Sequence, residues 1–303
     1  MKEKVVINEV GPRDGLQNQP KILNVDERLS IIQSLIDANL SAIEVSSFVS
    51  PKAVPAMDGA AMLCEGLPKV DGIDYSVLVP NEKGYERAIA AGAKSVAVVL
   101  SATEEMNQKN INMSLKTATE VCRAILQRSS ADQIKARAYV AVAFECPFEG
   151  KTSPEVVFDL VKDMFTAGAQ EVIIADTIGA AHPGTVDTLM QYLVDTYSAE
   201  TLSCHFHDTR GMALANVYAA LKTGIRKFDA SIGGLGGCPF APGATGNVAT
   251  EDVALMLEKM GFDTGLDLGQ LVLAVEKVKA LTGNCSGGHS FRWLQGQRYK
   301  GLL

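Results

Sequence analysis

A (β/α)8 barrel is the fold that this sequence predicts, from two observations. Between Val5 and Met260, eight short apolar runs are each followed by an amphipathic stretch, and about 250 residues is the usual size of a barrel built from eight such units. The runs are almost continuously apolar, which is typical of parallel strands covered on both faces. A doubly wound open sheet shares both features and is the structural alternative.

The expected strands are short apolar runs bounded by polar or turn-forming residues, as buried strands usually are. They are, in order, "VVINEV" (5–10), "AIEVSSF" (42–48), "DYSVLVP" (74–80), "SVAVVL" (95–100), "ARAYVAVAF" (136–144), "EVIIAD" (171–176), "TLSCHFHD" (201–208) and "KFDASI" (227–232).

A helical pattern follows each strand. In the first, Asp26 is the expected N-cap, and Leu29, Ile32, Leu35 and Ile36 share one face. The glycine that closes "NEKGYERAIAAG" suits a helix C-terminus. The other helical regions are expected to start near residue 54 and to cover residues 114–128, 154–167, 185–196, 212–223 and 248–260.

The chain is expected to form a single catalytic domain over residues 1–303. The barrel would occupy about residues 4–262, and about 263–303 would form a C-terminal helical extension. That extension carries one further helix pattern, "LGQLVLAVEKVKALTG". Neither a linker nor a low-complexity segment is visible in the sequence.

Composition and charge exclude several classes of protein. The formal net charge is -7 with dispersed acidic residues, so the sequence lacks the basic stripe of a nucleic-acid-binding protein. No apolar run approaches the roughly 18 residues that span a membrane, and the first residues show no signal-peptide pattern. Six scattered cysteines without zinc-site spacing favour reduced thiols in a cytoplasmic protein. The sequence does not decide the oligomeric state, and a homo-oligomer stays an open alternative.

Uncommon polar residues gather at the ends of the expected strands, and this edge of a barrel carries the active site. The set comprises Arg13, Asp14, Gln17, Glu44, Ser47, Asp176, His205, His207, Cys238, Asn247 and Glu251.

Four of these residues point to a metal site. Residues i and i+2 of a strand face the same way, so His205 and His207, two of the chain's four histidines, share a face. The first, seventh and eighth strands are neighbours in a closed barrel, which lets Asp14 and Asn247 reach the histidine pair. Mixed nitrogen and oxygen ligands suit an octahedral divalent cation such as Mg²⁺ or Mn²⁺.

Simpler interpretations stay open. The histidine pair could be hydrogen-bonded without a metal, and Arg13 and Asp14 could form an ion pair that ties down a loop. Cys238 could be a small buried thiol. The segment around it, "GGLGGCPFAPGATGN", instead favours unusual backbone angles and close approach of a ligand. Cys204 is expected to face away from the site and to pack in the core.

Seven segments together resemble the 3-hydroxy-3-methylglutaryl-CoA (HMG-CoA) lyase family. They are "NEVGPRDGLQN", "IEVSSFVSPKAVPAM", "KNIN", "CPFEGKTSP", "ADTIG", "HFHDTRGMALAN" and "SIGGLGGCPFAPGATGNVATEDV". The resemblance runs from about Val6 to Met260, and the glycine-rich cysteine loop is its most specific motif. The Arg-Asp-Gly-x-Gln motif and the histidine pair are less specific, because they also occur in a larger group of metal-dependent barrels. That group includes isopropylmalate and homocitrate synthases and carboxylase domains.

The resemblance implies divalent-metal-dependent retro-Claisen cleavage of (S)-HMG-CoA to acetyl-CoA and acetoacetate, a reaction of leucine degradation and ketone-body metabolism. By similarity, the metal ligands would be Asp14, His205, His207 and Asn247. Arg13 would bind the carbonyl oxygen of the substrate, and Cys238 would be the active-site thiol. Glu44 and Asp176 match residues that support the site. Substrate contacts are expected from Arg13, Gln17, Ser47 and Glu251.

These residue types suit the chemistry. Cleavage between C2 and C3 turns a tertiary alcohol into a ketone and leaves a thioester enolate. The alcohol must lose its proton, for which His205 is the first candidate acceptor and Asp176 the second. A guanidinium at Arg13 would stabilise the negative charge on the enolate oxygen. The thiol of Cys238 would then protonate the enolate carbon.

The chain departs from the family pattern at two loops that would shape the pocket. Arg210-Gly-Met212 replaces Tyr-Gly-Gln after "HDT", and His182 stands where a small residue is common. Citramalyl-CoA and longer 3-hydroxy-3-alkylglutaryl-CoA esters are therefore alternative substrates. A Claisen-condensing synthase and a non-catalytic barrel that binds acyl-CoA are the remaining alternatives.

Overall fold

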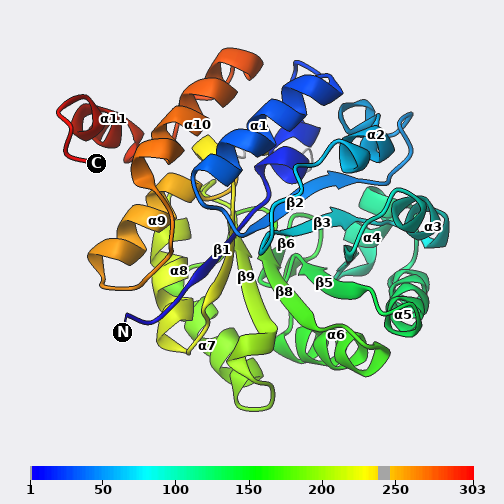
Figure 1. Cartoon of the computed structure of the whole chain (residues 1–303). Coiled ribbons are helices and arrows are strands. Elements are labelled where there is room, and N and C mark those ends of the chain that lie inside the picture. The colour runs from blue at the N-terminus through cyan, green and yellow to red at the C-terminus, as the bar shows by residue number, and fades with distance from the viewer. Residues whose placement is uncertain (1, 238–245) are drawn as a thin grey trace.

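Eight parallel strands close into a barrel in the computed structural model, which describes residues 2–237 and 246–303 (Figure 1). The order around the barrel is β1-β10-β9-β8-β5-β4-β3-β2. The strands are β1 (Val6–Glu9), β2 (Ala42–Ser47), β3 (Asp74–Leu78), β4 (Ser95–Ser101), β5 (Lys135–Ala141), β8 (Glu171–Asp176), β9 (Leu202–Phe206) and β10 (Lys227–Ala230). Because β1 pairs with both β2 and β10, the sheet is closed. The predicted barrel is confirmed, and the open sheet was the wrong alternative.

Helices surround the barrel on its outside (Figure 1). They are α1 (Val25–Asp37), α2 (Ala60–Glu65), α3 (Glu82–Ala90), α4 (Glu104–Ile111), α5 (Leu115–Ala131), α6 (Pro154–Ala167), α7 (Pro183–Val194), α8 (Ala213–Lys222), α9 (Thr250–Lys259), α10 (Leu268–Thr282) and α11 (Phe291–Tyr299). The C-terminal extension lies against the barrel's own helices, with α10 packed on α1 and α9, and α11 on α10.

The N-cap of the first helix is Asn24, two residues before the expected N-cap. Asn24 Oδ1 accepts the backbone N–H of Glu27, and the Glu27 carboxylate accepts the backbone N–H of Asn24, both at 2.9 Å. This reciprocal pair satisfies two of the free N–H groups at the helix start. The prediction of Asp26 as N-cap is wrong, because Asp26 lies inside the first turn.

Several short elements differ from the expectation. The helical region expected from residue 54 is a single 3-10 turn (Pro55–Met57), and α2 begins only after Gly59, whose φ of 72° interrupts the helix. The helices α4 and α11 and the hairpin of β6 (Glu145–Cys146) with β7 (Gly150–Lys151) were not foreseen. The C-terminal extension thus carries two helices rather than one.

The hydrophobic core lies mainly between the strands and the helices, where side chains such as Ile32 and Leu35 are fully buried. Burying an aliphatic side chain of this size stabilises the fold by about 1.5–3 kcal/mol. A second, small cluster centred on Tyr139 is separate from this layer. Polar side chains are buried near it, among them Glu44 and Asp229. Part of the buried interior is therefore polar, and its side chains contact residues of the candidate site.

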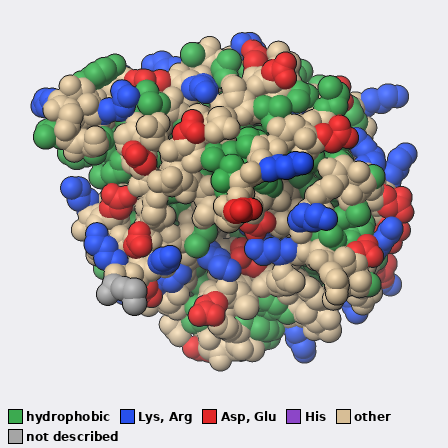
Figure 2. All heavy atoms as spheres, viewed as in Figure 1, with side chains coloured by type: hydrophobic (Ala, Val, Ile, Leu, Met, Phe, Trp, Pro, Cys, Tyr) green, Lys and Arg blue, Asp and Glu red, His purple; other side chains and the backbone are tan. Residues whose placement is uncertain are grey.

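Charged side chains of both signs intermingle over the face of the molecule that Figure 2 shows. Among the described residues, no helix has the length and apolar character needed to cross a membrane.

Candidate active site

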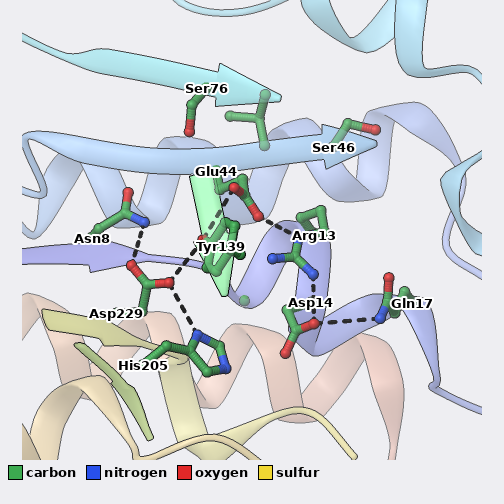
Figure 3. A network of polar contacts seen from close by, with 12 residues as sticks. Asn8, Arg13, Asp14, Gln17, Glu44, Ser46, Ser76, Tyr139, His205 and Asp229 are labelled. Carbon is green, nitrogen blue, oxygen red and sulfur yellow. Dashed lines mark hydrogen bonds and ion pairs between the residues drawn. The ribbon is translucent and has the colours of Figure 1, made fainter. Parts of the chain in front are cut away.

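The segment after β1 forms a tight π-helical turn, Gly11–Gly15, which carries Arg13 and Asp14. The backbone N–H groups of Arg13 and Asp14 both donate to the carbonyl oxygen of Val10, at 3.1 and 2.7 Å. Gly11 is required here, since a Cβ at this position would lie 2.6 Å from Glu9 Oε1. Single π-helical turns occur frequently at functional sites. In Figure 3, Asp14 lies near His205, and the Arg13 side chain lies between Glu44 and Asp14.

Asp14, His205 and His207 form a buried cluster. Each offers one ligand atom, and these atoms all lie within 4.8 Å of one another. Asp14 Oδ2 is 4.0 Å from His207 Nε2. Burial opposes ionisation of Asp14, but the positive charge of Arg13 leads the opposing effects, which include His205, His207 and the hydrogen bond from Asn247, and the pKa of Asp14 is lowered to about 2. Asp14 is therefore a carboxylate at neutral pH, as a metal ligand must be.

Asn247 joins this cluster through a short antiparallel bridge to His207. Its Nδ2 donates to Asp14 Oδ2 at 2.8 Å and to the carbonyl oxygen of Leu235 at 3.0 Å. Its Oδ1 is buried without a hydrogen-bond partner, which is uncommon for a buried amide oxygen. A half-turn of the amide would present Oδ1 to the same space beside Asp14.

The four side chains fit a divalent cation. Together they supply one carboxylate, two imidazoles and one amide oxygen without a partner. Such a mixed nitrogen and oxygen set leaves positions for water or substrate and suits an octahedral ion. The structure therefore brings together the four residues that the sequence predicted as ligands. Their ligation itself stays a prediction.

The two histidines have different environments. His205 Nδ1 lies 3.0 Å from Asp229 Oδ2; burial lowers the pKa of His205, but this hydrogen bond and the charge of Asp229 outweigh it, so the net shift is upward. In His207 no carboxylate is bonded to Nδ1, which is buried without a partner. Burial and the charge of His205 lower the pKa of His207 to about 4. His207 is therefore neutral at physiological pH, with a lone pair available for a metal.

Arg13 is held between two carboxylates. Its Nε donates to Glu44 Oε1, and its Nη1 donates to Asp14 Oδ1 at 2.6 Å. Glu44 is fully buried on β2, next to a register shift between Glu44 and Ser46. Such irregularities re-aim strand side chains near active sites. The ion pair considered for Arg13 and Asp14 is present, and it fixes the guanidinium beside the cluster rather than only tying down a loop.

Gln17 and Ser47 were also predicted to contact the substrate. Gln17 Nε2 donates to Asp14 Oδ1 at 3.3 Å, so it borders the cluster (Figure 3). Ser47 is 2 % exposed, and its Oγ has no hydrogen-bond partner.

Asp176 and Glu251 are bound mainly to the backbone. At the end of β8, the Asp176 carboxylate accepts the N–H groups of Ala180 and Ala181 at 2.8 and 3.1 Å, and burial raises the pKa of Asp176 to about 6. The Glu251 oxygens accept the N–H groups of Gly233 and Gly288 at 3.0 and 2.7 Å. Glu251 thus ties the segment before the cysteine loop to the C-terminal extension, and the structure does not bring it into the cluster.

The structure describes only one of the two cysteines that the sequence places near the site. Cys238 lies outside the described residues. Cys204 is fully buried in the core layer, with Sγ 3.7 Å from Met190 Sδ on α7. The prediction that Cys204 faces away from the histidine pair is confirmed.

Sequence reasoning missed the residues behind the cluster. Asp229 contacts His205, and Tyr139 and Asn8 contact Asp229. The signal for Asp229 was present in "KFDASI", where a single acidic residue interrupts an apolar strand. In the register of β10 with β9, Asp229 is the direct partner of His205.

Comparisons with known proteins agree with this geometry. The HMGL-like family model matches residues 4–278. The chain is 44 % identical over 272 residues to the mitochondrial hydroxymethylglutaryl-CoA lyase of Pongo abelii, covering 90 % of this chain and 84 % of the relative. It is 41 % identical over 292 residues to the 3-hydroxy-3-isohexenylglutaryl-CoA/hydroxymethylglutaryl-CoA lyase of Pseudomonas aeruginosa, covering 96 % and 97 %.

A solved structure has the same fold. It is an HMG-CoA lyase from Acinetobacter baumannii in complex with coenzyme A and 3-methylmalate, with a TM-score of 0.92 and 39 % identity over 95 % of this chain and 94 % of that one. The resemblance inferred from the sequence motifs is thereby confirmed. This chain belongs to the HMGL-like family.

Proposed function

We propose that this protein is a carbon–carbon lyase that cleaves (S)-3-hydroxy-3-methylglutaryl-CoA to acetyl-CoA and acetoacetate. The observation that carries the proposal is the buried cluster of Asp14, His205 and His207 beside the guanidinium of Arg13. The names of the relatives support the same reaction. An acyl-CoA substrate is supported by the related lyase that was solved with coenzyme A.

A divalent cation held by Asp14, His205, His207 and Asn247 would lower the pKa of the substrate's tertiary hydroxyl and fix its orientation. Mg²⁺ or Mn²⁺ is the proposed cation, because hard oxygen ligands and imidazoles accept either ion. The Oδ1 of Asn247 supports this choice, since it is an oxygen ligand without a partner; the half-turn that presents it to the cation would replace the two hydrogen bonds of Nδ2 with a bond to the metal.

The remaining steps belong to residues of this chain. Asp176 would take the hydroxyl proton, because Nδ1 of His205 is bound to Asp229 and the single lone pair on its Nε2 is needed for the cation. Burial raises the pKa of Asp176 to about 6, which is closer to the range that suits a general base. As the C2–C3 bond breaks, negative charge develops on the thioester oxygen, and Arg13 would stabilise it. Glu44 and Asp14 hold this guanidinium from two sides, so it is oriented before the substrate arrives. Cys238 is the proposed donor of the final proton to the enolate carbon, from its place in the glycine-rich loop.

A longer 3-hydroxy-3-alkylglutaryl-CoA ester is a second candidate substrate. The support for it is the name of the Pseudomonas aeruginosa relative, which includes 3-hydroxy-3-isohexenylglutaryl-CoA. The cytoplasm is the proposed location, because the five cysteines among the described residues are free thiols, as is usual in a reducing compartment.

A product assay tests the proposal. The purified protein is incubated with HMG-CoA, citramalyl-CoA and 3-hydroxy-3-isohexenylglutaryl-CoA, and acetyl-CoA and the ketone product are measured by chromatography. The expected result is metal-dependent release of acetyl-CoA and acetoacetate from HMG-CoA. Absence of acetyl-CoA from every ester in the presence of Mg²⁺ or Mn²⁺ would overturn it. Formation of a 2-substituted malate and free CoA from acetyl-CoA and a 2-oxo acid would instead indicate a synthase.

A further inference from the structure

The side chain of Asp229 lies directly behind His205. Asp229 is 2 % exposed on β10, and its Oδ2 is 3.0 Å from His205 Nδ1. The two residues are register partners on neighbouring strands. The contact is therefore fixed by the pairing of β10 with β9 and does not depend on a loop.

Asp229 is itself held by two donors (Figure 3). Asn8 Nδ2 donates to its Oδ1, and the Tyr139 hydroxyl donates to its Oδ2, both at 2.8 Å. Both oxygens of Asp229 thus accept hydrogen bonds from these donors, and a carboxylate that accepts on both oxygens requires a proton on Nδ1 for its bond to His205.

We infer that Asp229 is a positioning residue, which fixes His205 in the Nδ1–H tautomer and thereby turns the lone pair of Nε2 toward the space shared with Asp14. The inference rests on the proposed function, because that space is the proposed cation and substrate site. A carboxylate behind a metal-binding histidine commonly sets the tautomer and the ring orientation. His207 offers a contrast within the same site, since its Nδ1 has no hydrogen-bond partner.

Tyr139 links the pair of Asp229 and His205 to Arg13, because it lies near the Glu44 carboxylate that binds Arg13. Its hydroxyl lies 2.8 Å from Asp229 Oδ2 and 3.3 Å from Glu44 Oε2. Because a phenol carries one proton, it donates to one carboxylate at a time, and the shorter distance favours Asp229. The Tyr139 hydroxyl thus lies between the carboxylate that contacts His205 and the carboxylate that contacts Arg13, and its single proton holds the first of them.

The test combines nitrogen NMR with metal binding. In ¹⁵N-histidine-labelled protein without metal, at an alkaline pH where imidazoles are neutral, His205 is expected to carry its proton on Nδ1. The four histidines of the chain make the assignment tractable. In Asp229→Asn an amide N–H₂ can face Nδ1, so the proton should move to Nε2. Mn²⁺ affinity, measured by electron paramagnetic resonance, should then fall by roughly 10–100-fold.

A matched control is Glu171→Gln. Glu171 is also a buried strand carboxylate, but it bonds to Ser203 and Lys227 and not to a member of the cluster. The His205 tautomer and the Mn²⁺ affinity should both stay as in the unaltered protein. A second variant, Tyr139→Phe, removes one donor to Asp229 and should weaken Mn²⁺ binding by a smaller factor than Asp229→Asn, with the proton still on Nδ1.

Two results would overturn the inference. One is a proton on Nε2 of His205 in the unaltered protein, which is decisive even if Asp229→Asn fails to fold. The other is an Asp229→Asn protein with an unchanged tautomer and unchanged Mn²⁺ affinity. Failure of the proposed function would be seen separately, as absence of acetyl-CoA formation by the unaltered protein, while the NMR result would stand on its own.

Discussion

The Arg13 guanidinium lies 2.6 Å from the Asp14 carboxylate at a site where both side chains are largely buried. Glu44 contacts the same guanidinium from the other side. The three groups together carry a net charge of -1, which favours the binding of a cation beside them. Removal of one partner from such a buried pair leaves an uncompensated charge and is strongly destabilising. Informative substitutions at this site therefore have to preserve charge.

Arg13→Lys preserves the charge but loses the planar fork that holds two carboxylates. If the guanidinium stabilises the enolate, kcat should fall much more than KM rises, because an interaction made only in the transition state is lost. Steady-state kinetics with HMG-CoA measure both constants. A rise confined to KM would show that Arg13 only holds the ground-state substrate.

Removal of the cation should abolish turnover. The supporting observation is the donor set of Asp14, His205, His207 and Asn247, with one amide oxygen left without a partner. Exhaustive chelation followed by removal of the chelator should leave an inactive protein, and Mg²⁺ or Mn²⁺ should restore the rate. Asn247→Ala should raise the Mn²⁺ concentration needed for half-maximal activity. Full activity in metal-free protein would contradict the assignment of the site.

Cys238→Ser should reduce the rate by roughly 10²–10⁴-fold, the usual effect of losing a general acid or base. A hydroxyl keeps the size of the thiol but is a much weaker acid. Metal binding should survive, because Cys238 is not among the proposed ligands. The control is Cys204→Ser, since Cys204 packs on Met190 away from the cluster, and its kcat should stay within a small factor. The reverse pattern would contradict the proposed role of the thiol.

The sequence was sufficient for the residues whose positions depend on one strand at a time. Alternation along β9 places His205 and His207 on one face, and the closed barrel brings the segment after β1 beside them. Asp229 was missed because its role depends on the register between two strands, in which it pairs with His205. A single sequence does not specify that register. The start of α1 was misplaced for a related reason, because Asn24 and Asp26 are both good caps and only the reciprocal bonds of Glu27 select Asn24.

Glu9 provides a prediction about stability rather than activity. It is fully buried, and burial raises the pKa of Glu9 to about 7, against opposing hydrogen bonds from Thr250, Ile232 and Gly11. The folded protein therefore binds the proton of Glu9 more tightly than the unfolded chain, whose glutamate has the ordinary pKa of 4.5. The stability that Glu9 contributes is complete below the unfolded pKa and is lost as the pH rises through about 7.

Glu9→Gln removes this dependence while keeping the contacts. The amide oxygen can still accept the N–H groups of Gly11 and Ile232, and the amide N–H₂ can donate to Thr250 Oγ1. Relative to the unaltered protein, the free energy of unfolding of Glu9→Gln should rise by about 2.5 kcal/mol between about pH 5 and about pH 9. Urea denaturation at both pH values measures the difference, with the exposed Glu120→Gln as the control for loss of a carboxylate. A difference between Glu9→Gln and the unaltered protein that does not change with pH would show that Glu9 is ionised in the folded state across this range.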